Sequence, residues 1–359
     1  MQIGSSKAYF RNAHWSPAQP GTVFAAQSDR ILSAIAKHPA MTQTPLIADE
    51  HNSDGHVTCW IKNEGKRFAD EGLSCFKALG VLGVLAAKPD LANADRFVCA
   101  SDGNHGRAVA WAAQRLGVAA TVFMPGSVPQ ENFDRITQFG ARTVAVEGGY
   151  DRAIADAAED AHRTGAVEFS DTGRPGCEEI PYLTLFGYGR IVDEILDQMP
   201  SPPTHVLVPA GVGSLAAGVV ARFATRLGAE MPRIITAEPL HVAPVVASLE
   251  AGDIRSVPEG ATTSMACLAC ETPSNVAWEI LRDGLFGAMA ISDLVALKAM
   301  NDLQSSHATS AVFTQPSGAA AFAGLQEILS DSVLRTRAGL DGAANVVSLV
   351  TEGPSLVSG

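Results

Sequence analysis

The chain has 359 residues, 47% of them hydrophobic and 18% charged, enough to bury a substantial core in one large domain or two moderate ones. Its net charge of −12 argues against a nucleic-acid partner, which needs a basic surface. No run approaches the ~20 apolar residues of a membrane span, so we expect no membrane partner. Six dispersed cysteines do not make a disulfide scaffold, and residues 1–12 lack the apolar run of a signal peptide. We therefore expect a cytoplasmic protein.

From about residue 95, short apolar runs alternate with longer amphipathic segments. We expect strands at residues 96–101, 120–124, 142–146 and 167–170, and helices at 106–116, 129–139 and 150–162. The alternation resumes with strands at 205–209, 233–237 and 345–350 and a helix from 214 to about 226. This order predicts an α/β fold with a mostly parallel sheet covered on both faces. Residues 1–45 have weak periodicity and give no prediction.

Three polar or glycine-rich turns directly follow predicted strands. They are residues 101–106 (SDGNHG), 211–214 (GVGS) and 351–353 (TEG). Ligands of parallel α/β sheets bind outside the carboxyl ends of the strands. These turns therefore predict a ligand site at one edge of the sheet.

The GVGS turn is typical of an anion site. Gly211 and Gly213 let the backbone approach an anion, and the helix from Ser214 points its N–H groups toward it, so phosphate fits. The same turn also matches a dinucleotide pattern, with Glu238 after the next strand in the place of a ribose ligand. Close helix packing is a third explanation, and the motif alone leaves all three open.

Lys77 lies in the segment SCFKALG. Lysine is usually a solvated surface residue. Here Phe76, Ala78 and Leu79 flank it, so we expect partial desolvation, which lowers the pKa of a lysine and favours the neutral amine that forms Schiff bases.

Two further groups allow both a structural and a functional explanation. Asp102 and Asn104 share a turn that either only starts a helix or lets Asp102 abstract a proton while backbone N–H groups bind a carboxylate. Cys267 and Cys270 form a CxxC without a second pair or a nearby histidine, so we expect no metal site. Two partly buried thiols are favoured over a redox pair.

The lysine segment, the SxGNHG turn, the glycine-rich loop and QPSGA at 315–319 together resemble the fold type II (tryptophan-synthase β-like) pyridoxal-phosphate enzymes. The resemblance extends from about residue 44 to 353. Within that group, the chain is most similar to the diaminopropionate ammonia-lyase family. The shared segments are Arg67-Phe68, SDGNHGR running into VAW, CLAC leading to WEIL, and TEG. Asp102 is the discriminating residue, because related hydroxyamino-acid dehydratases usually carry a small serine-like residue there.

The resemblance implies a role for each matching residue. Lys77 would hold pyridoxal 5'-phosphate as a Schiff base, Asn104 would bond its ring oxygen, and Thr351 would face its pyridine nitrogen. The phosphate would be bound by Gly211, Val212, Gly213 and Ser214. Asp102 and Asp171 would transfer protons or recognise the substrate amine. The substrate would contact Ser101, Asp102, Gly103 and His105, with no catalytic role for His105.

The resemblance also implies a reaction and an architecture. The reaction is elimination of ammonia from 2,3-diaminopropionate, or a close β-substituted amino acid, to give pyruvate. The architecture is a homodimer whose large cofactor domain (1–78 and 186–359) carries a smaller inserted domain (79–185), each with a mostly parallel sheet.

Three segments depart from the family pattern and keep other functions open. They are ALGVLG after Lys77, GRPGCEEIP at 173–181, and Gln315-Pro316 in place of an acidic residue. All three surround the substrate more than the cofactor, so a serine- or threonine-type dehydratase is the first alternative. A nucleotide-binding oxidoreductase and a catalytically silent binding protein are the alternatives from other classes.

Overall fold

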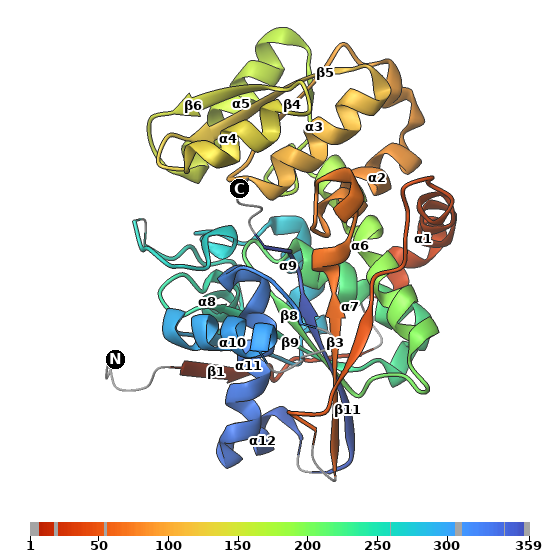
Figure 1. Cartoon of the computed structure of the whole chain (residues 1–359), viewed down its shortest axis with the longest axis vertical. Coiled ribbons are helices and arrows are strands. Elements are labelled where there is room, and N and C mark those ends of the chain that lie inside the picture. Colours follow the sequence, from red (N-terminus) through yellow and green to blue (C-terminus); the bar gives the residue numbers. More distant parts are fainter. Residues whose placement is uncertain are drawn as a thin grey trace.

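The computed structural model describes residues 7–17, 21–53, 56–258, 260–305, 311–340 and 342–354, and it contains two β-sheets surrounded by helices. Figure 1 shows the smaller sheet above the larger one, with α2 (Lys77–Ala87) and α6 (Glu179–Gln198) between them. The predicted α/β fold with two mostly parallel sheets is confirmed.

The large sheet has the strand order β1-β10-β9-β8-β11-β3-β2. Only its edge pairs β1–β10 and β2–β3 are antiparallel. In this order, the strands are Lys7–Arg11, Gly287–Ile291, Arg233–Pro239, His205–Pro209, Ala344–Val350, Val57–Asn63 and Leu46–Asp49. Its inner parallel strands are covered on both faces, which explains continuous apolar runs such as HVLVP.

The small sheet is entirely parallel, in the order β6-β5-β4-β7. Its strands are Arg142–Val146, Ala119–Pro125, Arg96–Ala100 and Val167–Glu168. The prediction of a strand over 167–170 is too long. The Phe169 N–H still bonds the Val98 carbonyl, but at Ser170 the chain turns, and the Ser170 hydroxyl bonds Thr172.

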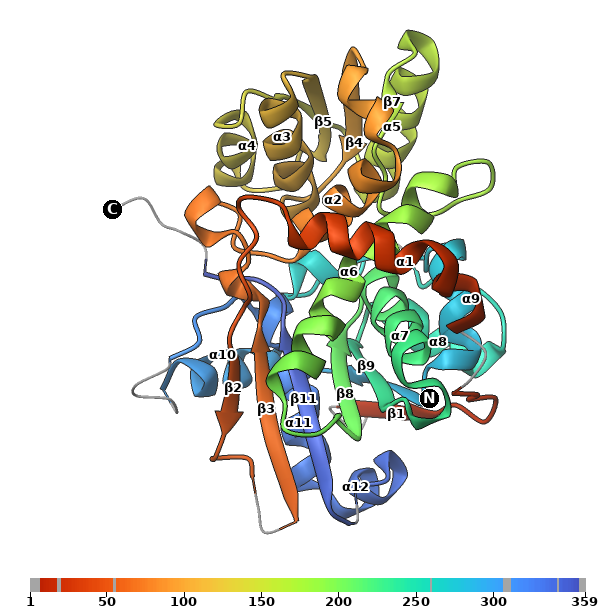
Figure 2. The ribbon, with the colours of Figure 1, turned by 90° about the vertical axis from the view of Figure 1, so that its right-hand side faces the viewer.

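Helices bury both faces of each sheet. Against one face of the large sheet lie α10 (Asp293–Ser305), α11 (Pro316–Ser330) and α12 (Ser332–Ala338). The opposite core contains α6 with α1 (Gly21–Ala36), α7 (Ser214–Leu227) and α9 (Asn275–Gly284), and Figure 2 shows α1 crossing this layer. The small sheet is covered by α3 (Asn104–Leu116), α4 (Gln130–Thr137) and α5 (Tyr150–Thr164).

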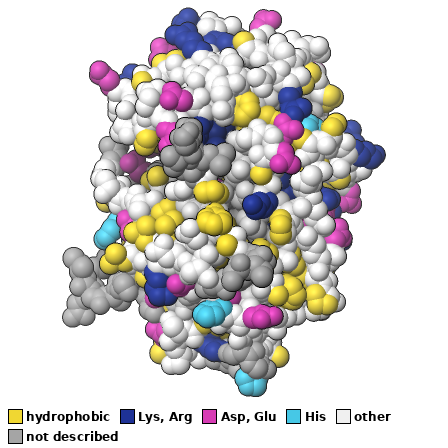
Figure 3. All heavy atoms as spheres, in the orientation of Figure 1, with side chains coloured by type: hydrophobic (Ala, Val, Ile, Leu, Met, Phe, Trp, Pro, Cys, Tyr) yellow, Lys and Arg dark blue, Asp and Glu magenta, His cyan; other side chains and the backbone are white. Residues whose placement is uncertain are grey.

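Shorter elements complete the described chain. The helix α8 spans Pro244–Ala251, and 3₁₀ turns lie at Glu64–Lys66, Ala69–Glu71, Pro89–Asn93, Gly228–Glu230 and Ala266–Leu268. None of the described helices is long and apolar enough to cross a membrane. On the face drawn in Figure 3, basic and acidic side chains are interspersed.

Glycines bring α2 and α6 into close contact. A Cβ atom on Gly187 would lie 1.9 Å from the Leu79 carbonyl oxygen, and one on Gly83 would lie 2.8 Å from the Gly187 nitrogen. Any larger residue at Gly187 would force the helices apart. Since α2 begins at Lys77, this contact fixes where that lysine lies.

Four charged side chains are buried together between β3 and α6. Lys62, Glu64, Arg67 and Glu194 each have a side chain that is 0% exposed. The Arg67 guanidinium lies 2.8 Å from Glu64 Oε2 and 2.7 Å from Glu194 Oε2, and Lys62 Nζ lies 2.8 Å from Glu194 Oε2. Buried charges persist only when they are paired in this way. The cluster therefore joins the segment preceding Lys77 to α6.

Candidate active site

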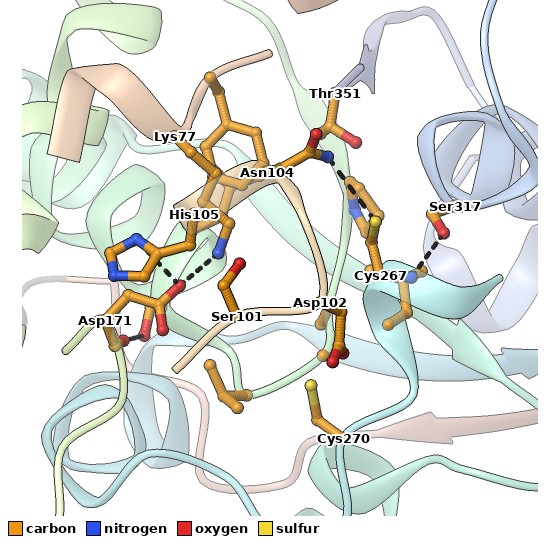
Figure 4. A pocket seen from close by; sticks show the side chains of 18 of the residues that line it. Lys77, Ser101, Asp102, Asn104, His105, Asp171, Cys267, Cys270, Ser317 and Thr351 are labelled. Atoms are coloured by element: carbon orange, nitrogen blue, oxygen red, sulfur yellow. Dashed lines mark hydrogen bonds and ion pairs between the residues drawn. The ribbon is translucent and has the colours of Figure 1, made fainter. Parts of the chain in front are cut away.

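One pocket lies where the two sheets face each other, at the carboxyl ends of β4, β7, β8 and β11. It is lined by all twelve residues that the sequence predicts for the site: Lys77, Ser101, Asp102, Gly103, Asn104, His105, Asp171, Gly211, Val212, Gly213, Ser214 and Thr351. Figure 4 shows the lysine amine and the Asp171 carboxylate pointing toward each other, and Asp102 beside Cys270. Segments up to 274 positions apart, from residue 77 to residue 351, thus meet at one point.

Lys77 and Asp171 form an ion pair in the pocket, with Nζ 2.5 Å from Oδ2. The sequence-based expectation that the pKa of Lys77 is lowered is wrong for this arrangement. Burial does lower it, but the Asp171 carboxylate outweighs burial and raises the pKa of Lys77 above its ordinary value. Burial likewise raises the pKa of Asp171, while His105 and Lys77 bring it well below the ordinary value. Lys77 therefore carries its proton here.

His105 is hydrogen-bonded to the segment that follows β7 and leads to Asp171. Its Nε2 lies 2.7 Å from the Phe169 carbonyl oxygen, which can only accept, so Nε2 carries the hydrogen. Burial lowers the pKa of His105 and Lys77 adds to the effect, while the Asp171 carboxylate opposes both. Its Nδ1 lies 3.8 Å from Asp171 Oδ2 and has no hydrogen-bond partner among the described residues.

Asp102 presents an unbonded carboxyl group to the same pocket. Its backbone carbonyl accepts from Asn132 Nδ2 at 2.9 Å, but its carboxylate makes no hydrogen bond to another described residue. Burial, reinforced by Asp171, raises the pKa of Asp102 to about 7. The Ser101 hydroxyl shapes this loop by accepting from the N–H groups of Gly103 and Gly106, at 2.9 and 2.8 Å. Asp102 and Asp171 thus have pKa values shifted in opposite directions.

The GVGS loop lies at the N-terminus of α7. Gly213 has φ +89°, and a Cβ there would lie 2.6 Å from Leu281 Cδ1. Gly211 packs on Cys270, whose Sγ would be 2.9 Å from an added Cβ. The Ser214 hydroxyl donates to the Asp171 carbonyl at 2.8 Å, which ties the loop to the small sheet. Glycines are thus required here, and they leave the first-turn N–H groups of α7 open to an anion.

The prediction of Glu238 as a possible ribose ligand is wrong. Glu238 is fully buried, and its two carboxyl oxygens accept from the N–H groups of Val245 and Val246, at 2.9 and 2.8 Å. It caps the start of α8 inside the core. The dinucleotide interpretation of GVGS therefore loses its ribose contact.

Asn104 and Thr351 lie near each other in the pocket (Figure 4). Asn104 begins α3 without capping it; its Nδ2 donates to Glu352 Oε2 at 2.5 Å instead. The 351–353 turn holds the lysine segment, because the Phe76 N–H bonds the Thr351 carbonyl at 3.4 Å and the Gly353 N–H bonds the Ser74 carbonyl at 2.8 Å.

Several lining residues are not among the site residues that the sequence predicts: Phe76, Tyr150, Thr172, Cys267, Cys270, Ser317 and Glu352. Tyr150 follows β6, so the strand-end argument could have found it. Burial raises the pKa of its phenol well above the ordinary value. Ser317 accepts from the Cys267 N–H at 3.1 Å. Among the described residues, no three metal-ligating side chains cluster together.

The pocket fits pyridoxal phosphate. Its lining contains a partly buried amine, an anion-binding helix terminus and two polar atoms, His105 Nδ1 and Glu352 Oε1, that have no hydrogen-bond partner among the described residues. A phosphate would lie at Gly211 to Ser214 and an aldehyde carbon at Lys77.

The comparisons with known proteins agree with this fit. The family model described as "Pyridoxal-phosphate dependent enzyme" matches residues 38–352. The diaminopropionate ammonia-lyase of Salmonella typhimurium (strain LT2) is 33% identical over 359 aligned positions, covering 90% of this chain and 88% of that protein. The Escherichia coli (strain K12) protein of that name is 34% identical over 283, covering 72% and 70%.

A solved structure extends the match. It is the Escherichia coli diaminopropionate ammonia-lyase in complex with an aminoacrylate-PLP azomethine reaction intermediate. It superposes with a TM-score of 0.87 at 29% identity, covering 97% of this chain and 94% of that one. The chain is therefore a pyridoxal-phosphate-dependent enzyme of fold type II. It belongs to the diaminopropionate ammonia-lyase family.

Proposed function

We propose that this enzyme eliminates ammonia from 2,3-diaminopropionate, or a close β-substituted amino acid, to give pyruvate. One observation carries the proposal: two acidic side chains with different pKa values, Asp102 and Asp171, line the same pocket as Lys77. A diamine substrate brings a second nitrogen besides the one that would bond the cofactor, and an acidic side chain suits that second nitrogen. The relatives named diaminopropionate ammonia-lyase support the substrate.

The proposed cofactor contacts use residues that line the pocket, with the roles that the family resemblance implies. Lys77 would bind the cofactor aldehyde, Asn104 its ring oxygen, Thr351 its pyridine nitrogen, and the backbone from Gly211 to Ser214 its phosphate. When bound, the cofactor supplies an electron-accepting ring that stabilises negative charge at the substrate α-carbon.

The chain's own residues move the protons. Backbone N–H groups of the 101–106 loop bind the substrate carboxylate, and Ser101, Gly103 and His105 shape that loop. Asp102 or the released Lys77 amine takes the α-proton, and the β-nitrogen takes up a proton as it leaves as ammonia. Asp171, which pairs with the Lys77 ammonium in the structure, would attract a substrate ammonium in the same way. Hydrolysis of the released product gives pyruvate and a second ammonia.

The pH dependence tests the role of Asp102. A base must be deprotonated, so kcat/KM should rise with pH through a midpoint near 7, the pKa of Asp102, and fall below it. Asp102→Asn should lower kcat/KM by about 10²- to 10⁴-fold and remove that limb. A pH–rate profile of both proteins measures this. A limb near 7 that survives in Asp102→Asn would assign the titration to another group.

The ratio of products separates the two lyase functions. With 2,3-diaminopropionate we expect two ammonia per pyruvate, whereas a serine or threonine dehydratase releases one ammonia per keto acid. Asp102 favours the diamine, while the departures at 173–181 and 315–316 favour the hydroxyamino acid. Assaying ammonia and keto acid on diaminopropionate, serine and threonine measures the preference. Turnover of serine or threonine alone would reject the diamine proposal.

Three further proposals concern the whole protein. The family resemblance supports a homodimer. Six unpaired cysteines favour a reducing compartment such as the cytoplasm. The small sheet, within residues 96–168, supports a division into a large domain (1–78 and 186–359) and an inserted one (79–185). Sedimentation, cell fractionation and limited proteolysis test these in turn.

A further inference from the structure

The side-chain amide of Asn104 is held at both ends. Its Oδ1 accepts from Nη2 of Arg107, one turn further along α3. Its Nδ2 donates to Glu352 Oε2 at 2.5 Å, across to the 351–353 turn. The proposed chemistry uses neither Arg107 nor Glu352.

Glu352 is built firmly into the site. It is 7% exposed, and its other carboxyl oxygen, Oε1, has no hydrogen-bond partner among the described residues. Gly318 and Gly65 make room for it, since a Cβ on Gly318 would lie 3.0 Å from Glu352 Cγ, and one on Gly65 would lie 2.9 Å from its backbone carbonyl. A buried carboxyl group is costly unless it is hydrogen-bonded, and Asn104 Nδ2, Cys267 Sγ and the Gly318 N–H contact this one.

The two partners determine which way the amide faces. A guanidinium only donates, so Arg107 must meet the amide oxygen. Oε2 of a carboxyl group can accept in either protonation state, so Glu352 meets the amide nitrogen. Rotating the amide by half a turn would place donor against donor and acceptor against acceptor. Asn104 Nδ2 carries two hydrogens, and Glu352 accepts one of them. The second hydrogen meets only Cys267 Sγ among the described residues, a weak acceptor at 3.6 Å, so it is available to a ligand.

We propose that Arg107 and Glu352 are positioning residues. They hold the side-chain amide of Asn104 so that its second N–H points at the hydroxyl oxygen on the pyridine ring of pyridoxal phosphate. This rests on the role of Asn104 proposed above. Without the lock the amide turns, and its carbonyl oxygen meets the ring oxygen, replacing a hydrogen bond by a repulsion. Arg107 and Glu352 thus act on the cofactor through Asn104.

A double-mutant cycle on the holoenzyme tests the proposal. The variants are Glu352→Met, which removes the acceptor, Glu352→Gln, which keeps one, Asn104→Ala, and the double Asn104→Ala/Glu352→Met. The readouts are the dissociation constant for pyridoxal phosphate and the pH midpoint of the visible band of the bound cofactor.

We expect Glu352→Met to weaken cofactor binding roughly three- to tenfold, the worth of one hydrogen bond, and to shift the midpoint in the same direction as Asn104→Ala. Glu352→Gln should restore both values to near wild type. The double variant should match Asn104→Ala alone, because Glu352 has nothing left to position.

A wild-type affinity and midpoint in Glu352→Met would overturn the proposal, as would effects that add in the double variant. If Glu352→Met does not fold, Arg107→Met in the same cycle with Asn104→Ala decides by the same criteria. A wild-type protein with no visible band after adding pyridoxal phosphate would instead remove the cofactor contacts proposed above, an outcome distinct from failure of the lock.

Discussion

Replacing Lys77 by alanine is expected to abolish the visible absorption band of the bound cofactor and to lower kcat by at least about 10³-fold. The side chain supplies the amine that bonds the cofactor aldehyde and, once released, an amine that can carry the α-proton. Its loss also leaves the Asp171 carboxylate, 5% exposed, without its counter-ion in the pocket. Absorption between 300 and 500 nm and pyruvate formation from diaminopropionate measure the two effects.

A matched control is Lys298→Ala. Lys298 lies on α10 with 71% of its side chain exposed and pairs with Asp302 one turn away, so its removal should change neither band nor rate. If Lys77→Ala kept a band that borohydride reduces onto the chain, another lysine would carry the cofactor and the assignment of Lys77 would be wrong.

The second large effect concerns stability. Arg67→Met should lower the free energy of unfolding by about 3–5 kcal/mol, because it leaves the buried carboxylates of Glu64 and Glu194 with too little positive charge. Urea denaturation of the holoenzyme measures the change. Arg226→Met is the control: Arg226 pairs with Asp193 but is 38% exposed, so about 1 kcal/mol or less is expected. Equal losses in both variants would contradict the special cost of burial.

The same buried cluster predicts that the free energy of unfolding falls at acid pH. Burial raises the pKa of Glu194, but Arg67 and Lys62 outweigh it and lower the pKa to about 2, from an ordinary 4.5. The folded state therefore binds fewer protons at this site than the unfolded state. The resulting stabilisation is complete above about pH 4.5 and is lost as the pH falls toward 2. In Arg67→Met the dependence in this window should be flatter.

The sequence predicted best where local pattern and final environment agree. The strands at 142–146 and 205–209 were predicted to the residue, since a short apolar run between polar turns usually forms a strand. By contrast, β3 was missed because it ends in Lys62 and Asn63. A lysine is normally read as surface, and here it is neutralised by Glu194, 132 positions away. No local pattern contains that partner.

The same contrast between local pattern and distant contacts holds for the active site. Strand-end turns brought 101–106, 211–214 and 351–353 together because parallel strands carry their carboxyl ends to one edge. The pKa of Lys77 was predicted in the wrong direction because its neighbours in sequence are apolar, while its neighbour in space is Asp171. Glu352 belonged to a recognised motif, yet its contact with Asn104 spans 248 positions and needed the fold.

The place of β11 in the large sheet has a consequence for biosynthesis. This strand, the last described in the chain, lies between β8 and β3 and is the one that joins the β3–β2 pair to the rest of the sheet. While the chain is being synthesised, the backbone groups of β3 and β8 that pair with β11 therefore have no partner strand until residues 344–350 leave the ribosome. A nascent chain halted just short of Ala344 would hold almost every residue of the site and still lack the strand that brings them together.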